Sequence, residues 1–260
     1  MDTMRDYDDA TYGEAFADVY DEWYADIGDL DATTRTLAEL AAGGAVLELG
    51  VGTGRIAIPL AGEVGAMYGV DTSGAMLERL AAKPGADRVE AVHADMVDGL
   101  PEGPFALVFV AYNTFFNLRT AARQQDCFRA VAERLAPGGV FVIEAFVPNP
   151  AQTSAPEVGV RSITADRVVL SISTADPHAQ TAWGQYVDIT ETGGVRLRPW
   201  SIRWATPVEL DEMAVAAGLV FEQRWAGFDR SPFDLNSPRH VSVYRKSETR
   251  PLARGAQVVG

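Results

Sequence analysis

The chain has 260 residues, 47% of them apolar, and a formal net charge of −14 at pH 7. It is long enough to bury a full core as one globular domain, and its acidic balance argues against a nucleic-acid partner, which requires a positively charged surface. The apolar runs are no longer than a strand, and the first ten residues (MDTMRDYDDA) hold no basic segment followed by an apolar one, so we expect neither a membrane span nor a signal peptide.

Residues 1–32 form the segment that we expect to be an N-terminal helical lid. Phe16, Val19, Tyr20, Trp23 and Tyr24 recur at helical spacing, which predicts one helix with an aromatic stripe packed inward and its acids facing water. This helix is either a plain surface helix or a roof over a ligand site. A second helix is expected over 33–42, where a glycine pair ends it.

A glycine-rich turn follows the first predicted strand. Strand 46–49 runs into Gly50, Gly52 and Gly54, and helical spacing resumes at Arg55. Glycines allow the positive φ that such a turn requires, and they let the main chain approach a ligand closely. Because a cation at a helix start is unfavourable, Arg55 either binds an anionic group of a ligand or extends away into solvent.

Strands and helices then alternate through 33–150, the expected core. Strands are predicted at 66–70, 89–94, 105–112 and 140–147, and helices at 73–82 and 119–136. This order predicts an α/β fold with a doubly wound parallel sheet.

The pattern changes after residue 150. Runs at 167–174, 180–189 and 195–204, separated by turn residues, predict an antiparallel β cap within 151–206, over the carboxyl edge of the sheet. Residues 207–246 are expected to form the C-terminal part of the core, with a helix at 207–217 and strand-like runs at 219–225 and 240–245. Residues 247–260 are expected to be a flexible tail.

Acidic residues end two of the predicted strands. Asp71 follows strand 66–70, where a carboxylate can accept both hydroxyls of a ribose, although it can also cap the helix 73–82. Asp95 and Met96 follow strand 89–94, where an acid can also simply open a loop. Asp71 therefore predicts a nucleoside ligand without choosing which one.

The spacing of residues in the glycine turn distinguishes between two kinds of nucleoside-binding site. Dinucleotide-binding turns read G-x-G-x-x-G, whereas Glu48 to Gly54 reads E-x-G-x-G-x-G, with an acid two residues before the first glycine. Here the chain resembles the class I S-adenosylmethionine (SAM)-dependent methyltransferases, well over 45–147 and more loosely over 207–245. The resemblance implies a Rossmann-like seven-stranded, mostly parallel sheet with an inserted antiparallel β cap. It also implies SAM as cofactor, S-adenosylhomocysteine as product, and no metal.

The resemblance assigns roles to the residues around the turn. It implies that Asp71 binds the ribose, Asp95 accepts from the adenine amine and Met96 packs on the adenine ring. A tyrosine of the lid would contact the carboxylate of the methionine part of SAM, and the segment that follows strand 105–112 would lie beside the sulfonium. The cofactor residues implied are Tyr20, Tyr24, Gly50, Gly52, Gly54, Arg55, Asp71, Thr72, Met76, Asp95, Met96, Ala111, Asn113 and Phe116.

A general base is required only if the nucleophile arrives protonated. Glu144, an acid in an apolar strand, and His240, at the start of the last strand, are the candidate catalytic residues. Residues 105–148 also resemble amino-sugar N,N-dimethyltransferases, in which the matching acid faces the substrate. The substrate residues expected are Tyr112, Glu144, Arg203 and Trp204. In the cap, Arg196 and Arg198 lie beside Trp200, and they either grip an anionic substrate group or form a solvated face.

The sequence as a whole predicts a SAM-dependent methyltransferase of EC class 2.1.1 that acts on a small molecule, with an amine nitrogen as the acceptor. The alternatives are an O-methyltransferase acting on a phenol or acid, a protein that binds SAM without transfer, and an NAD-dependent oxidoreductase. A small-molecule acceptor is the expected partner, and a homodimer is left open. The single cysteine, Cys127, excludes an internal disulfide and favours the cytoplasm. The scarcity of lysine is typical of bacteria with GC-rich genomes.

Overall fold

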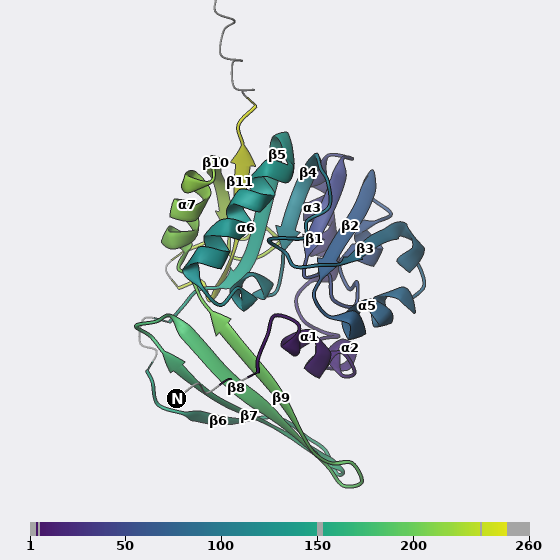
Figure 1. Ribbon diagram of the computed structural model, residues 1–260, viewed down its shortest axis with the longest axis vertical. Helices are drawn as coiled ribbons and strands as arrows, with labels where there is room; N and C mark the ends of the chain where they lie inside the picture. The colour runs from purple at the N-terminus through teal and green to yellow at the C-terminus, as the bar shows by residue number, and fades with distance from the viewer. Residues whose placement is uncertain (1–3, 5, 150–152, 235, 249–260) are drawn as a thin grey trace, which may run out of the picture.

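Two β-sheets form the framework of the molecule (Figure 1), whose computed structural model describes residues 4, 6–149, 153–234 and 236–248. Sheet A contains β1 (Ala45–Leu49), β2 (Ala66–Asp71), β3 (Val89–His93), β4 (Phe105–Val110), β5 (Leu135–Phe146), β10 (Leu219–Trp225) and β11 (Arg239–Lys246). Its strand order is β10-β11-β5-β4-β1-β2-β3, with β11 antiparallel to both of its neighbours and β1 to β5 mutually parallel. The predicted seven-stranded, mostly parallel sheet is confirmed.

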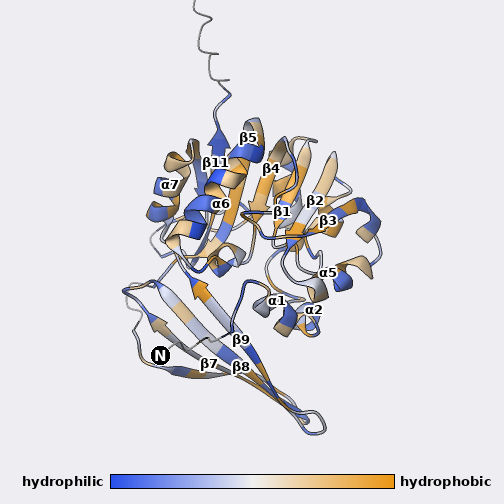
Figure 2. Ribbon diagram, viewed as in Figure 1, coloured by the Kyte–Doolittle hydropathy of each residue, from blue (hydrophilic) through white to orange (hydrophobic). Residues whose placement is uncertain are grey.

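Helices cover both faces of sheet A. The helices of the molecule are α1 (Thr11–Phe16), α2 (Tyr20–Trp23), α3 (Leu30–Ala41), α4 (Ala57–Leu60), α5 (Gly74–Ala81), α6 (Ala121–Arg134) and α7 (Pro207–Ala216), with 3-10 turns η1 (Ala86–Arg88) and η2 (Thr114–Asn117). Of these, α1 and α2 do not cover a face of the sheet but lie near its carboxyl edge (Figure 1). Phe128 of α6 packs with Phe141 of β5 on one face, and Leu37 of α3 packs with Val142 on the other. The central strands are consequently mostly apolar, as the orange colour of β1 and β4 in Figure 2 shows, and the exceptions are the buried acids Glu48 of β1 and Glu144 of β5.

Sheet B is the predicted cap, and it has one more strand than expected. Its strands are β6 (Glu157–Ile163), β7 (Arg167–Asp176), β8 (Thr181–Thr190) and β9 (Gly194–Arg203), antiparallel in that order. The additional strand, β6, was missed because Gly159 and a bulge after Val160 interrupt its alternation of apolar residues. Sheet B lies beyond the carboxyl edge of sheet A (Figure 1).

The lid differs from the single helix that the aromatic stripe predicts. It forms two short helices, α1 and α2, because the N–H of Val19 bonds to Phe16 O at 3.0 Å and tightens the chain between them. The helical spacing that resumes at Arg55 likewise yields only the single turn α4. Of the predicted tail, residues 249–260 lie outside the described part of the chain.

Ion pairs made by the buried guanidinium of Arg198 fasten the lid to sheet B. Arg198 is held by Asp18 of the lid at 2.6 Å and by Asp188 at 3.2 Å, while Arg167 binds Asp188 at 2.6 Å. Arg196 reaches the same Asp18 at 2.6 Å from an exposed position. The prediction that Arg196 and Arg198 either grip a substrate anion or form a solvated face is therefore wrong for Arg198, which is almost fully buried against the lid.

Replacement of Arg198 by alanine should destabilise the protein by about 3 kcal/mol, because Asp18 and Asp188 lose a buried charged partner. Arg196→Ala is the matched control: its side chain is 53% exposed, compared with 2% for Arg198. This variant should cost less than about 1 kcal/mol. Urea unfolding at neutral pH measures both free energies, and equal losses in the two variants would contradict the assignment.

The same pairs predict a pH dependence. Burial alone would raise the pKa of Asp18, but the hydrogen bond and charge of Arg198 hold this pKa below its usual value. Arg167 lowers the pKa of Asp188 in the same way. Since the unfolded chain then binds more protons in acid, this part of the stability is complete above about pH 4 and is lost as the pH falls further. The stability difference between wild type and Arg198→Ala should shrink over that range.

Candidate active site

The glycine turn brings the end of β1 against the segment that follows β4. Gly50 has a φ of 71°, and a Cβ atom on it would lie 2.3 Å from Cγ2 of Thr114. The N–H groups of Gly50 and Val51 both donate to Val70 O, at 2.8 and 2.9 Å. Only glycine satisfies both the positive φ and this close approach.

Asp71 holds the turn from the neighbouring strand. Its Oδ2 accepts from the N–H of Gly52 at 2.8 Å, and its Oδ1 accepts from the N–H of Ser73 at 2.9 Å. Ser73, not Asp71, caps α5, since its hydroxyl accepts from the N–H of Met76. Burial raises the pKa of Asp71, whereas the two N–H donors lower it.

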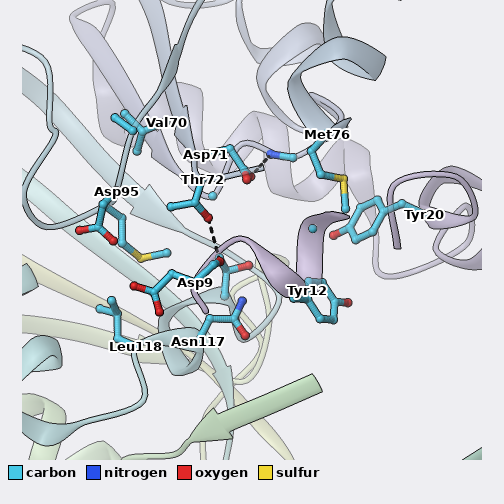
Figure 3. A pocket seen from close by; sticks show the side chains of 16 residues that line it. Asp9, Tyr12, Tyr20, Val70, Asp71, Thr72, Met76, Asp95, Asn117 and Leu118 are labelled. Atoms are coloured by element: carbon cyan, nitrogen blue, oxygen red, sulfur yellow. Dashed lines mark hydrogen bonds between the residues drawn. The ribbon is translucent and has the colours of Figure 1, made fainter. Parts of the chain in front are cut away.

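A pocket of about 640 Å³ lies at this edge of sheet A. Eight of the predicted cofactor residues line it: Tyr20, Gly50, Gly52, Asp71, Thr72, Met76, Asp95 and Met96. Figure 3 shows their side chains converging from the ends of β2 and β3 and from the lid, with the hydroxyl of Thr72 donating to Asp9 O at 2.8 Å. The remaining lining residues were missed by the sequence analysis: Asp9, Tyr12, Gly13, Val70, Ala94, Thr114, Asn117 and Leu118.

Asp95 lies at one end of this pocket, where β3 ends. Its Oδ1 accepts from the N–H groups of Val97 at 2.8 Å and Asp98 at 3.0 Å, and from Arg123 at 2.6 Å. These three contacts fix the carboxyl group without using Oδ2. The arrangement suits a carboxylate that accepts a hydrogen bond from a purine amine.

A second, smaller pocket shares Tyr20, Gly50 and Thr114 with the first. Arg55 reaches into it, with its guanidinium 4.1 Å from the centre of the Tyr112 ring and its Nη1 donating to Ile27 O at 3.0 Å.

Two buried atoms in the smaller pocket have no hydrogen-bond partner within the described part of the chain: Nη2 of Arg55 and Oε2 of Glu48. Burial raises the pKa of Glu48 well above its usual value, although the charge of Arg55 opposes this. A ligand end that carries both a carboxylate and an ammonium supplies a partner to each atom. The two pockets together therefore fit a nucleoside joined to an amino acid, as in SAM.

Four predicted cofactor residues line neither pocket. The hydroxyl of Tyr24 lies 3.3 Å from that of Tyr12, which does line the first pocket. Gly54 adopts a φ of 77° within the glycine turn. Asn113 accepts from the N–H of Phe146 at 2.7 Å, and Phe116 is fully buried against Phe146. The other two predicted residues, Arg55 and Ala111, line the smaller pocket.

Glu144 lies in a separate pocket with Tyr112 and Arg239. Its Oε2 accepts from the N–H of Tyr112 at 3.1 Å, and its carbonyl accepts from the N–H of Asn113 at 3.2 Å. Burial raises the pKa of Glu144. Tyr112 and Asn113 have φ values of 53° and 65°, so Glu144 holds two consecutive strained residues in place.

His240 is fully buried, with its Nδ1 2.8 Å from the hydroxyl of Ser242. Burial lowers the pKa of His240 to about 3, so the ring is neutral at physiological pH. It lines none of the pockets described, and its predicted role as a base has no support from the geometry.

A further pocket of about 660 Å³ lies between the end of β5 and sheet B. Its lining includes Phe146, Glu157, Trp200, Ile202 and Trp204, and Trp204 is among the residues that the sequence analysis expects to contact substrate. Arg203 does not line this pocket, because its guanidinium is buried between the side-chain oxygens of Gln124 and Gln180, at 2.5 and 2.7 Å. The expectation that Arg203 contacts substrate is therefore wrong, since these internal partners already hold it.

Two negative findings apply to the described residues. They include no cluster of three or more His, Cys, Asp or Glu side chains that is arranged to hold a metal ion. No helix that they form has the length and apolar character required to cross a bilayer.

Comparison with known proteins gives consistent matches. Residues 46–139 match the family described as "Methyltransferase domain". The chain is 31% identical over 210 residues to a cypemycin N-terminal methyltransferase from Streptomyces sp, covering 78% of this chain and 84% of the relative. It is 42% identical to the CcbJ methyltransferase of Streptomyces caelestis, with a TM-score of 0.86 over 93% of this chain and 100% of that one. The SAM-bound structure of CalS10, an amino pentose methyltransferase from Micromonospora echinaspora, has the same fold, at 19% identity and a TM-score of 0.68 over 88% and 97% of the chains.

Replacement of Asp95 by asparagine should weaken SAM binding about tenfold, because a charged acceptor at the purine end becomes neutral. Asp98→Asn is the matched control, since Asp98 also binds Arg123, at 2.7 Å, but lies outside the pocket. Isothermal titration calorimetry with SAM measures both affinities. Equal affinities for the two variants would refute the assignment of Asp95.

Proposed function

The chain belongs to the class I SAM-dependent methyltransferases and uses SAM as its methyl donor, and from that premise we propose that it methylates an amine nitrogen of a small molecule. The observation that carries this choice is the 31% identity to a relative whose name specifies an N-terminal methyltransferase. The chain and that relative match over most of their lengths, 78% and 84%. We propose a bacterial cytoplasm as the setting.

Bound SAM supplies a methyl group on a sulfonium centre, which is a good leaving group. The residues of the chain would bind and orient it: Asp71 would hold the ribose and Asp95 the adenine amine. Arg55 and Glu48 would receive the carboxylate and the ammonium of the methionine end. The charges of that end offset those of the two buried groups.

We assign the pocket beside sheet B to the acceptor. Its wall toward the cofactor pocket is η2, where Thr114 and Asn117 face the cofactor and Phe116 packs against Phe146 on the acceptor side. The aromatic lining suits an acceptor with an apolar body. Placement of the two reactants and exclusion of water then account for most of the catalysis.

An amine also fits the positions of the titratable groups. A neutral amine already presents a lone pair, and it loses its proton to water after transfer, so no base has to touch it. Of the two candidate bases, Glu144 is committed to the N–H of Tyr112 and His240 is fully buried. O-methylation of a phenol would instead need one of them within reach of the hydroxyl.

The test is incubation of the protein and SAM with matched panels of primary and secondary amines, phenols and carboxylic acids, with mass-spectrometric detection of S-adenosylhomocysteine and of the methylated product. We expect turnover with amines, at a rate that rises with pH until the acceptor amine is fully deprotonated. Turnover with phenols alone would favour the O-methyltransferase. SAM binding without any turnover would favour a binding protein.

Glu144 variants separate a base from a support for the backbone. Glu144→Gln keeps an oxygen that can accept from the N–H of Tyr112, and it should retain amine methylation within about threefold. Glu144→Ala leaves the strained turn unsupported and should lose at least tenfold in both SAM affinity and turnover. Loss of turnover in both variants with SAM affinity intact would instead identify Glu144 as the base.

Trp200→Ala should raise the KM for the acceptor about tenfold, because an aromatic wall of the proposed acceptor pocket is lost. The dissociation constant for SAM should not change. Trp183→Ala is the matched control, since Trp183 belongs to β8 of the same sheet but points to its opposite face. Equal KM values for the two variants would place the acceptor elsewhere.

A further inference from the structure

One row of residues crosses the proposed acceptor pocket and ends in a carboxylate. Directly paired residues of antiparallel strands share a face, and the row Glu157, Ser173, Gly184 and Trp200 runs from β6 to β9. Glu157, Ser173 and Trp200 line the pocket. Adjacent strands lie about 4.8 Å apart, so roughly 14 Å separates the Cα atoms of Glu157 and Trp200. Since β9 contacts η2 and β6 is the opposite edge of sheet B, Glu157 lies at the end of the pocket that is remote from the cofactor.

The indole ring of Trp200 extends from β9 toward that carboxylate. A Cβ atom on Gly184 would lie 2.9 Å from Cε2 and Cζ2 of Trp200, so the ring lies against the main chain of β8. Only a residue without a side chain leaves room for the ring there. Because β8 lies between β9 and β6 in the sheet, the row presents an aromatic surface followed by an acid.

Glu157 has no counter-charge within the described part of the chain. Its side chain is exposed, and no described residue pairs with its carboxylate. Among the described residues that line the pocket, it is the only charged one. A carboxylate attracts a cation directly, and an aromatic ring attracts it through its quadrupole. The net charge of −14 on the chain adds to this preference for a positive ligand.

We propose that the methyl acceptor is an amine that carries a second, positively charged nitrogen group, and that Glu157 binds this group. The inference rests on the proposed function, which assigns this pocket to the acceptor. The reacting nitrogen has to be neutral, because its lone pair forms the new N–CH3 bond as the S–CH3 bond of SAM breaks. The charge that Glu157 attracts must therefore belong to another nitrogen of the same molecule, in an ammonium or guanidinium group.

Other groups are poorer partners for this end of the pocket. A hydroxyl can donate a hydrogen bond to Glu157, but it only replaces one from water, which gives little net free energy. It also leaves the charge of the carboxylate uncompensated. An anionic group is repelled by Glu157 and by the overall charge of the chain.

The test compares four probes with the same eight-carbon chain: octamethylenediamine, aminooctanol, octylamine and aminooctanoic acid. Each has an amine at one end, and the other end is an ammonium, a hydroxyl, a methyl or a carboxylate group. Calorimetric titration into protein saturated with S-adenosylhomocysteine measures their affinities without turnover. We expect octamethylenediamine to bind about fivefold more tightly than octylamine or aminooctanol, and aminooctanoic acid to bind most weakly. Added salt should reduce these differences, since Glu157 is exposed.

Two variants of Glu157 test the role of its charge. Glu157→Gln keeps the size of the side chain, and it should bring the affinities for octamethylenediamine and octylamine to within about twofold of each other. Glu157→Arg should reverse the order of octamethylenediamine and aminooctanoic acid. Glu191→Gln is the matched control, because Glu191 is also exposed but lies in the turn between β8 and β9, outside the pocket. This variant should keep the wild-type order, and titration with SAM shows that all three variants are folded.

Equal wild-type affinities for octamethylenediamine and aminooctanol would overturn the proposal, as would failure of all four probes to bind. A preference for the diamine that persists in Glu157→Gln would overturn it as well. The proposed function fails by a different result: no methylated product from any amine, with the calorimetric preference intact, would refute amine methylation but not the cation site. Methylation of amines by a protein without that preference would refute only the role of Glu157.

Discussion

The structure depends on acidic residues of the lid, which bind the lid both to the core around sheet A and to sheet B. Toward sheet A, Glu14 accepts from the hydroxyl of Ser73 at 2.8 Å, and Asp21 accepts from Thr53 and Lys83, at 2.6 and 2.8 Å. Toward sheet B, Asp18 binds Arg198. The lid thus packs against both the core and the cap, and these contacts hold α1 and α2, which are too short to be stable alone.

This arrangement couples the cofactor pocket to the cap. Tyr12 and Tyr20 of the lid line the pocket that Asp71 and Asp95 line from the core, so a ligand in this pocket contacts the lid and the core at once. Binding must therefore stabilise the packing of the lid on the core. Because Asp18 ties the same segment to sheet B, the position of the proposed acceptor pocket depends on the lid as well.

The sequence predicts the elements of the fold well because each has a local periodicity, but it does not reveal which distant residues meet. The strands and the glycine turn were recognised from such patterns. The acids of the lid looked like a solvated face, since nothing near Asp18 in the sequence points to Arg198, 180 residues away. The same holds for Arg203, whose partners Gln124 and Gln180 lie in other elements, so the sequence does not show that internal hydrogen bonds hold its side chain.

Glu144 shows how strand alternation decides what an acid can do. Ile143 and Ala145 face the side of sheet A that packs against α6, so Glu144 points to the opposite side, into the pocket that it shares with Arg239. From there it reaches the N–H of Tyr112 and, through its carbonyl, that of Asn113. Both residues have positive φ, a conformation that costs roughly 1–3 kcal/mol each. The turn that they form places the Tyr112 ring against Arg55. It leads directly into η2, the proposed wall between the cofactor pocket and the acceptor pocket. We therefore propose that Glu144 supports this strained turn, because its Oε2 and its main-chain carbonyl oxygen both accept hydrogen bonds from the backbone that shapes the site.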